Sequence, residues 1–123
     1  MKGKIRKKKI LVADDDKSIL EALKLILEDE GYVVETITDG KTVLKLHGNY
    51  PDLILLDIWM YGMDGREICS VIKSQKSTKN IPIILVSANK DTALIAKEVG
   101  ADDFLAKPFE IIELLEKVKK YTD

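Results

Sequence analysis

The sequence predicts an α/β fold in which five parallel strands alternate with helices. Short apolar runs of strand length alternate with longer segments whose apolar residues recur at helical spacing, and this order repeats five times. Strands joined by single helices pair in parallel, so helices are expected to cover both faces of one sheet. With 123 residues, 46% of them hydrophobic, the chain can form one domain with one core.

The apolar runs differ in polar content, which indicates their places in the sheet. Residues 52–57 read DLILLD, a run without alternation that is typical of a central strand buried on both faces. Residues 32–37 read YVVETI, and their polar positions favour an edge. The expected strands are residues 10–13, 32–37, 52–57, 81–86 and 102–106.

The expected helices have recognisable ends. Asp16 is expected to cap the first helix, Gly31 to end it in the left-handed conformation, and the fourth helix to stop at Gly100. The second helix is expected to continue to Tyr50, and the third to cover about residues 64–76. The apolar helix residues expected to form core-facing stripes are Ile19, Leu20, Leu23, Ile26 and Leu27, then Val43, Leu44 and Leu46, then Ala93, Leu94, Ala96 and Val99, and finally Ile111, Ile112, Leu114, Leu115 and Val118.

Composition narrows the class of protein. The net charge of −1 argues against general nucleic-acid binding, and neither a membrane-spanning run nor a signal-peptide pattern is found, so a cytoplasmic setting is expected. Cys69 lies in a helical apolar pattern and is expected to be a core residue, and His47 to be a helix-surface residue. Residues 1–8 are expected to form a basic, solvated tail ahead of one domain at residues 9–122. A patch for an acidic partner is the less favoured interpretation of that tail.

Polar residues collect where the expected strands end. Asp14 and Asp15 follow the first strand, Asp57 ends the third, Ser87 follows the fourth and Lys107 follows the fifth. The carboxyl ends of parallel strands meet at one rim, where ligands of open α/β sheets bind. Each residue alone has an ordinary explanation, such as a turn, a cap or a surface charge. Their joint occurrence at the ends of four strands favours a functional site.

The chemistry of that group indicates a metal and a phosphoryl group. Three close carboxylates repel one another, and Mg²⁺ is a cation that accepts carboxylate oxygens while keeping waters that a phosphate displaces. Lys107 adds a second positive charge. A carboxylate in that setting is prepared to attack phosphorus and form an aspartyl phosphate, with the cations stabilising the charge on the transferred group.

These residues match a known family. From about Lys9 to Tyr121 the chain resembles the receiver domain of bacterial two-component response regulators. No single motif carries the resemblance, but their joint order and spacing are specific. The motifs are VADDD at residues 12–16, LDIWM at 56–60, GMDG at 62–65, VSA at 86–88, GADDF at 100–104 and KPF at 107–109.

The resemblance implies a flavodoxin-like (βα)5 three-layer sandwich with strand order 2-1-3-4-5, so that residues 9–122 form the receiver domain. It also implies a metal site, for Mg²⁺ with Mn²⁺ as an alternative. Asp57 corresponds to the phosphoacceptor and a metal ligand, Asp15 to the direct ligand and Asp14 to a ligand acting mainly through water. The backbone carbonyl of Trp59 corresponds to the third protein ligand.

Further roles follow from the same resemblance. Ser87 corresponds to the hydroxyl that bonds the phosphoryl group, and Lys107, whose bond to Pro108 is usually cis in this family, to the site lysine. Phe104 corresponds to the aromatic switch residue that acts with Ser87. We expect Trp59, and Asn89 on the other side, to flank the path of water to the phosphoryl group and to control its lifetime.

The implied partners are a sensor histidine kinase or a histidine phosphotransfer protein, and a downstream protein that binds the face of the fourth helix, fifth strand and fifth helix. Phosphorylation is expected to switch this protein-binding surface, and the protein is expected to be a monomer or a phosphorylation-dependent dimer. It is not expected to be an enzyme, apart from catalysing its own phosphoryl transfer and slow dephosphorylation. No DNA-binding or membrane segment is expected as part of this protein. A stand-alone receiver and a fragment of a longer regulator remain alternatives.

Two departures from the family pattern and one competing interpretation concern the loop after Asp57, and a second competing interpretation concerns the loop after the first strand. Tyr61 stands where the family often has proline, and position 59 carries a bulky tryptophan. An aspartate-nucleophile phosphohydrolase needs an acid–base group two residues after the nucleophile, where Trp59 cannot transfer protons. A flavodoxin-like cofactor carrier needs a hydroxyl- and glycine-rich phosphate loop, where this chain has Asp14, Asp15 and Asp16.

Overall fold

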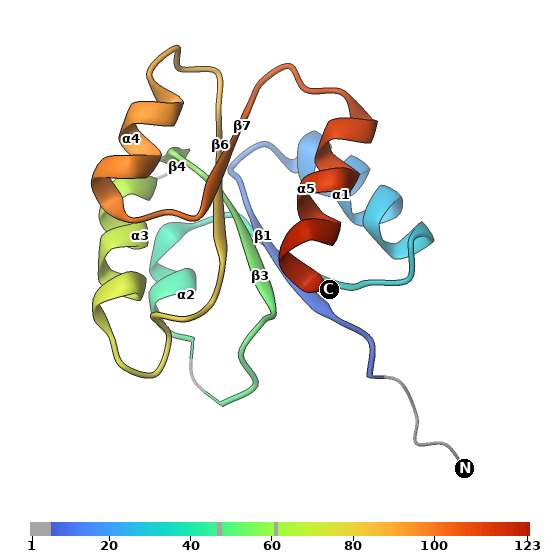
Figure 1. Ribbon diagram of the computed structural model, residues 1–123, viewed down its shortest axis with the longest axis horizontal. Coiled ribbons are helices and arrows are strands. Elements are labelled where there is room, and N and C mark those ends of the chain that lie inside the picture. Colours follow the sequence, from blue (N-terminus) through green and yellow to red (C-terminus); the bar gives the residue numbers. More distant parts are fainter. Residues whose placement is uncertain (1–5, 47, 61) are drawn as a thin grey trace.

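A single sheet of five parallel strands divides the molecule in the computed structural model, which describes residues 6–46, 48–60 and 62–123 (Figure 1). In spatial order, the strands are β2 (Val33–Ile37), β1 (Lys9–Ala13), β3 (Leu53–Asp57), β6 (Ile83–Ser87) and β7 (Asp103–Ala106). The expected order 2-1-3-4-5 and the flavodoxin-like fold are therefore confirmed. The strand with polar positions, β2, lies at an edge, and every residue of the central β3 is buried.

Helices cover both faces of this sheet. Figure 1 shows α1 and α5 on one side and α2, α3 and α4 on the other. Their bounds are Lys17–Asp29 for α1, Gly40–Leu44 for α2, Gly65–Ser74 for α3, Thr92–Val99 for α4 and Ile111–Thr122 for α5. Successive side chains of a strand point to opposite faces, so β1 and β3 supply two separate apolar clusters, one under each helical layer.

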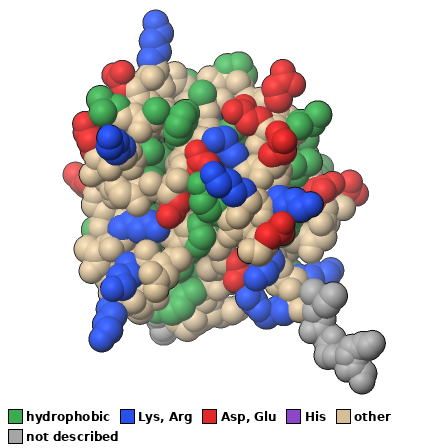
Figure 2. All heavy atoms as spheres, in the orientation of Figure 1, with side chains coloured by type: hydrophobic (Ala, Val, Ile, Leu, Met, Phe, Trp, Pro, Cys, Tyr) green, Lys and Arg blue, Asp and Glu red, His purple; other side chains and the backbone are tan. Residues whose placement is uncertain are grey.

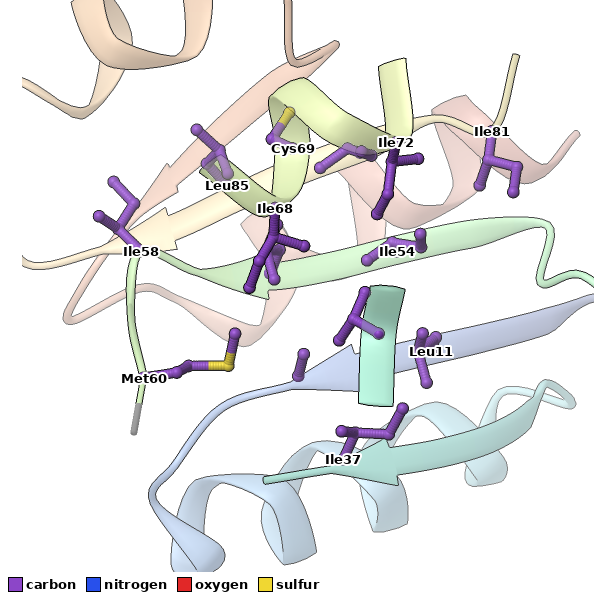
Figure 3. Packing of buried hydrophobic residues seen from close by; sticks show 14 of the residues in the cluster. Leu11, Ile37, Ile54, Ile58, Met60, Ile68, Cys69, Ile72, Ile81 and Leu85 are labelled. Atoms are coloured by element: carbon purple, nitrogen blue, oxygen red, sulfur yellow. The ribbon is translucent and has the colours of Figure 1, made fainter. Parts of the chain in front are cut away.

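The cluster between the sheet and helices α2, α3 and α4 is shown in Figure 3. Leu11 and Ile54 from the sheet pack with Ile68, Cys69 and Ile72 of α3. Cys69 is fully buried, and burial raises the pKa of its thiol to about 11. The prediction of a core cysteine is confirmed.

The predicted start of α1 and the predicted ends of α1 and α4 are also confirmed. The Asp16 carboxylate accepts hydrogen bonds from the backbone N–H groups of Ser18 and Ile19 at the start of α1. Gly31 (φ 97°) and Gly100 (φ 79°) follow α1 and α4 in the left-handed conformation, which glycine adopts without steric cost.

Two elements differ from expectation. Helix α2 ends at Leu44 rather than near Tyr50, and Gly48, with a φ of 83°, has a conformation that a right-handed helix cannot include. A short antiparallel pair, β4 (Trp59–Met60) and β5 (Met63–Asp64), occupies the segment expected to be only a loop. The predictions for His47 and Tyr61 concern residues outside those that the structure describes.

The core-facing sides of two helices were predicted only in part: Ala96, Leu114 and Val118 are buried as expected, whereas other expected residues are exposed. In α4, Ile95 is buried and Leu94 is 57% exposed, because Leu94 lies about 100° away from Ile95 around the helix. In α5, Leu114 is buried, whereas Ile111 and Ile112 are 53% and 71% exposed. Ile112 lies about 200° from Leu114 around the helix.

The surface carries mixed charge. Figure 2 shows acidic and basic side chains interspersed over the visible face. Arg6, in the segment expected to be a solvated tail, instead pairs with Asp52, with Nη2 and Oδ1 2.8 Å apart. Among the described residues, no helix combines the length and the apolar character that crossing a membrane requires.

Candidate functional site

The five polar residues predicted at the strand ends lie at one rim of the sheet. In the parallel register, Asp57 of β3 is opposite Val86 of β6, and Ser87 is opposite Ala106 of β7, so consecutive strands end at the same level. An open cavity of about 460 Å³ lies at this rim. Its described lining consists of Asp15, Asp57, Trp59, Ser87, Ala88, Asn89 and Lys107.

Lys107 connects the acidic residues. Its Nζ donates a hydrogen bond to Asp14 Oδ2 at 2.9 Å and lies 3.7 Å from Asp57 Oδ2. Burial lowers the pKa of Lys107, but the hydrogen bond to Asp14 and the charge of Asp57 outweigh burial and leave the pKa raised. The amine is therefore a fixed positive charge at neutral pH. The peptide bond from Lys107 to Pro108 is cis, as the resemblance implied.

Asp57 is a buried acid in an electrostatically unfavourable place. Its side chain lies at the end of the central strand, and the residue is only 7% exposed. Burial first, and then the charge of Asp14, raises the pKa of Asp57 to about 6, although Lys107 partly offsets both effects. The nearest described backbone donor, Trp59 N–H, is 3.4 Å from Oδ1. Asp57 therefore lacks enough positive charge around it to restore an ordinary pKa.

The acidic residues form a group that can hold a metal ion. One carboxylate oxygen from each of Asp14, Asp15 and Asp57 lies within 4.8 Å of the others. Ligands on opposite sides of an octahedral Mg²⁺ ion are about 4.2 Å apart, so small side-chain adjustments would bring these oxygens into one coordination shell. The donor set is all oxygen and carries more negative charge than Lys107 neutralises. These residues fit a hard divalent cation.

The remaining predicted residues occupy two different places. Trp59 is 54% exposed at the cavity, and Ser87 is buried, with its Oγ accepting a hydrogen bond from Asn89 N–H at 3.0 Å. Phe104 stands outside the described cavity lining: it is half-buried, packs against the cluster of Figure 3, and has Lys117 Nζ 5.1 Å from its ring centroid. The structure thus brings together every predicted site residue except Phe104.

Sequence reasoning missed the structural role of Gly65. A β-carbon at this position would lie 2.3 Å from the carbonyl oxygen of Asp57 and 2.8 Å from Ile58 Cα. Gly65 N–H also donates a hydrogen bond to the Ile58 carbonyl. Only glycine allows the start of α3 to approach the acceptor segment this closely. The available signal was a glycine directly after Asp64, which caps the helix.

Comparison with known proteins agrees with this arrangement. The family model described as the response regulator receiver domain matches residues 10–119. The chain belongs to this family. As a receiver domain of two-component response regulators, it shares 37% identity over 116 residues with the DNA-binding response regulator MtrA of Mycobacterium tuberculosis, an alignment covering 92% of this chain and 50% of MtrA. It is 40% identical over 113 residues to the response regulator ArlR of Staphylococcus aureus, covering 89% and 50% of the two chains.

Solved structures match the receiver domain over nearly its whole length. A putative response regulator from Chloroflexus aurantiacus superimposes with a TM-score of 0.90 at 32% identity, covering 95% of this chain and 98% of that one. Vibrio cholerae chemotaxis protein CheY4 gives a TM-score of 0.85 at 31% identity, covering 94% and 99%. The chain spans about half the length of the curated relatives that it matches.

Proposed function

We propose that Asp57 accepts a phosphoryl group from a sensor histidine kinase or a histidine phosphotransfer protein, and that its phosphorylation switches a protein-binding surface. The observation that carries this proposal is the position of Asp57. It is a buried carboxylate with a raised pKa, 3.7 Å from a lysine amine and within 4.8 Å of two further acids, at the end of the central strand. The proposed setting is the cytoplasm.

We assign the acidic group to Mg²⁺, with Mn²⁺ as an alternative, because both ions accept oxygen ligands. Asp15 and Asp57 line the cavity, whereas both oxygens of Asp14 accept protein hydrogen bonds, from Asp16 N–H and Lys107 Nζ. Asp15 is therefore the better direct ligand, and Asp14 acts mainly through water. The Trp59 carbonyl is the proposed third protein ligand. A bound cation would neutralise charge on the phosphoryl oxygens.

In the proposed transfer, a carboxylate oxygen of Asp57 attacks phosphorus as the bond to the donor imidazole nitrogen breaks. The nitrogen keeps the electron pair. Lys107 Nζ, already within 4 Å of Asp57, moves onto a phosphoryl oxygen, and Ser87 Oγ donates to another. At neutral pH most Asp57 is deprotonated despite a pKa of about 6, so the nucleophile is available. The domain thus catalyses its own phosphorylation from the donor and its own slow dephosphorylation.

The proposed switch uses Ser87 and Phe104. When Ser87 Oγ turns toward the phosphoryl group, it gives up the hydrogen bond from Asn89 N–H and draws residues 87–89 toward Asp57. The half-buried Phe104 ring then fills the space that is released, because burying more of an aromatic ring is favourable. The altered surface is the face of α4, β7 and α5, where Leu94 and Ile111 are exposed. A downstream protein, or a second phosphorylated copy, is the proposed partner.

The DNA-binding activity named for MtrA belongs to a protein twice the length of the alignment, so our proposal for this chain covers only the receiver step. Trp59 and Asn89 both line the cavity. We propose that they flank Asp57 from opposite sides and control how long the phosphoryl group lasts.

The proposal is tested by incubating the protein with acetyl phosphate and Mg²⁺. We expect hydroxylamine-sensitive phosphorylation of the wild type and its loss in Asp57→Asn. Asp52→Asn is the matched control, because Asp52 immediately precedes the same strand at its other end. Full labelling of Asp57→Asn, or equal labelling without a divalent cation, would contradict the proposed function.

A further inference from the structure

The cationic side chain of Arg66 lies against the indole of Trp59. It has no part in the proposed phosphoryl transfer. Arg66 Cζ lies 5.1 Å from the centroid of the Trp59 ring. At that distance a guanidinium group is attracted by the negative face of the ring. Trp59 is directly opposite Asp64 in the β4–β5 pair, which brings the start of α3 beside the indole.

Asp64 fixes the plane of the Arg66 guanidinium. Asp64 Oδ1 accepts a hydrogen bond from Arg66 Nε at 3.0 Å, and Asp64 Oδ2 accepts one from Arg66 Nη2. The same carboxylate caps α3 by accepting from the Arg66 backbone N–H at 2.8 Å. Two parallel bonds to one carboxylate restrict an arginine more than a single contact does. The Trp59–Arg66 pair is therefore anchored in the β4–β5 hairpin and in the first turn of α3.

The Trp59–Arg66 pair lies at the edge of the phosphorylation site. Trp59 and Asp57 both line the cavity. Arg66 contacts the Trp59 ring but is not one of the described lining residues. We propose that Arg66 is a positioning residue that holds the Trp59 indole at the mouth of the cavity and thereby slows the approach of water to a phosphoryl group on Asp57. This inference rests on the proposed function of Asp57 and deepens it by naming the group that controls its lifetime.

The size of the effect follows from the contact. An exposed cation–π pair is a weak contact, so its removal should shift the balance between the held and the released indole by about two- to fivefold. Hydrolysis needs a water in line with the phosphorus–oxygen bond, so its rate follows the released population. Arg66→Ala should therefore speed loss of phosphate by about two- to fivefold.

The first measurement needs no phosphorylation. Trp59 is the single tryptophan of the chain, so its fluorescence reports on this position alone. Quenching by acrylamide should increase in Arg66→Ala. Arg6→Ala is the matched control, since it removes another Arg–Asp pair far from the cavity, and it should leave the quenching unchanged.

The second measurement is loss of phosphate from purified, partner-free protein in a double-mutant cycle. Arg66→Ala should accelerate the loss in the wild-type background and have no further effect in Trp59→Ala, because the arginine acts through the indole. Thermal unfolding of each variant identifies any general loss of the fold.

Unchanged quenching in Arg66→Ala would overturn the positioning role, and equal acceleration in both backgrounds would overturn its action through Trp59. Failure of the wild type to accept phosphate would overturn the proposed function of Asp57 instead, and the quenching result would still decide whether Arg66 holds the indole.

Discussion

An aspartate lies at each end of the central strand, and the pKa of one is lowered whereas the pKa of the other is raised. Before β3, Asp52 accepts hydrogen bonds from Arg6 and from Lys9 N–H, and the bond to Arg6 is the main reason that its pKa is lowered. At the end of β3, burial raises the pKa of Asp57 to about 6. Two causes separate the acids: Asp57 is more deeply buried, and it lies beside Asp14 and shares Lys107 with it, whereas Asp52 has its own hydrogen bond from Arg6.

The same contrast extends across the sheet. At the amino-terminal edge, Asp102 is paired with Lys73 at 2.6 Å and also accepts from Ile83 N–H. At the carboxyl-terminal rim, three carboxylates share one described lysine, Lys107. Charges that only stabilise a fold are paired one to one, whereas an excess of one sign costs stability until a ligand compensates it. The unpaired rim is therefore where we place the cation and the phosphoryl group.

The largest expected effect comes from removing the only described lysine of the rim. Lys107→Ala should slow phosphorylation of Asp57 by about 10²–10³-fold, the usual effect of deleting one group that stabilises transition-state charge. Rates of acetyl phosphate-dependent labelling measure this. Lys73→Ala, which breaks a lysine–aspartate pair at the other edge, should leave the rate unchanged. Similar slowing in both variants would remove the distinction between the two edges.

A stability measurement sharpens the comparison. Because the folded pKa of Asp57 lies above its ordinary value, the folded protein binds a proton more tightly, and that stabilisation is present below about pH 4 and lost as pH rises through about 6. Asp57→Asn should therefore stabilise the metal-free protein at pH 7 by roughly 1–2 kcal/mol, less than the full shift because water screens the charges. Urea unfolding at pH 7 and pH 4 tests this. Destabilisation at pH 7 would contradict it.

A divalent cation bound at the acidic rim should offset its excess negative charge. Mg²⁺ at five times its Kd should stabilise the wild type by about 1 kcal/mol, through preferential binding to the folded state. Asp15→Asn should lose most of this response in thermal melting. Asp16→Asn is the control, because Asp16 is the N-cap of α1 and asparagine also caps a helix. An equal response in Asp15→Asn would exclude Asp15 from the metal site.

The smallest effect is expected at the paired edge. Arg6→Ala should lower the free energy of unfolding only slightly, and less in high salt, as exposed ion pairs do. Phosphorylation should be unaffected. Denaturant unfolding at two salt concentrations provides the measurement, and a large cost that salt does not reduce would mean that the pair is more than a surface contact.

The strands and the acidic rim could be predicted from the sequence because both depend on local patterns of residues. An apolar run followed by Asp57 indicates a buried strand and a strand end together, and parallel pairing then places such ends side by side. The side of α4 that is buried could not be predicted, since Leu94 and Ile95 are equally apolar and the loops determine the rotation of the helix. The contacts of Gly65 with the Asp57 carbonyl and of Arg66 with Trp59 depend on the β4–β5 pair, which has no clear signal in the sequence.

The most direct test of the contrast is a carboxyl NMR titration of Asp52 and Asp57 in one sample, with and without Mg²⁺. The account predicts that Asp52 titrates below the ordinary range of aspartate, that Asp57 titrates near pH 6 without metal, and that Mg²⁺ lowers the apparent pKa of Asp57 alone. Ordinary, equal values for both residues, or an Asp57 titration that Mg²⁺ does not move, would contradict it.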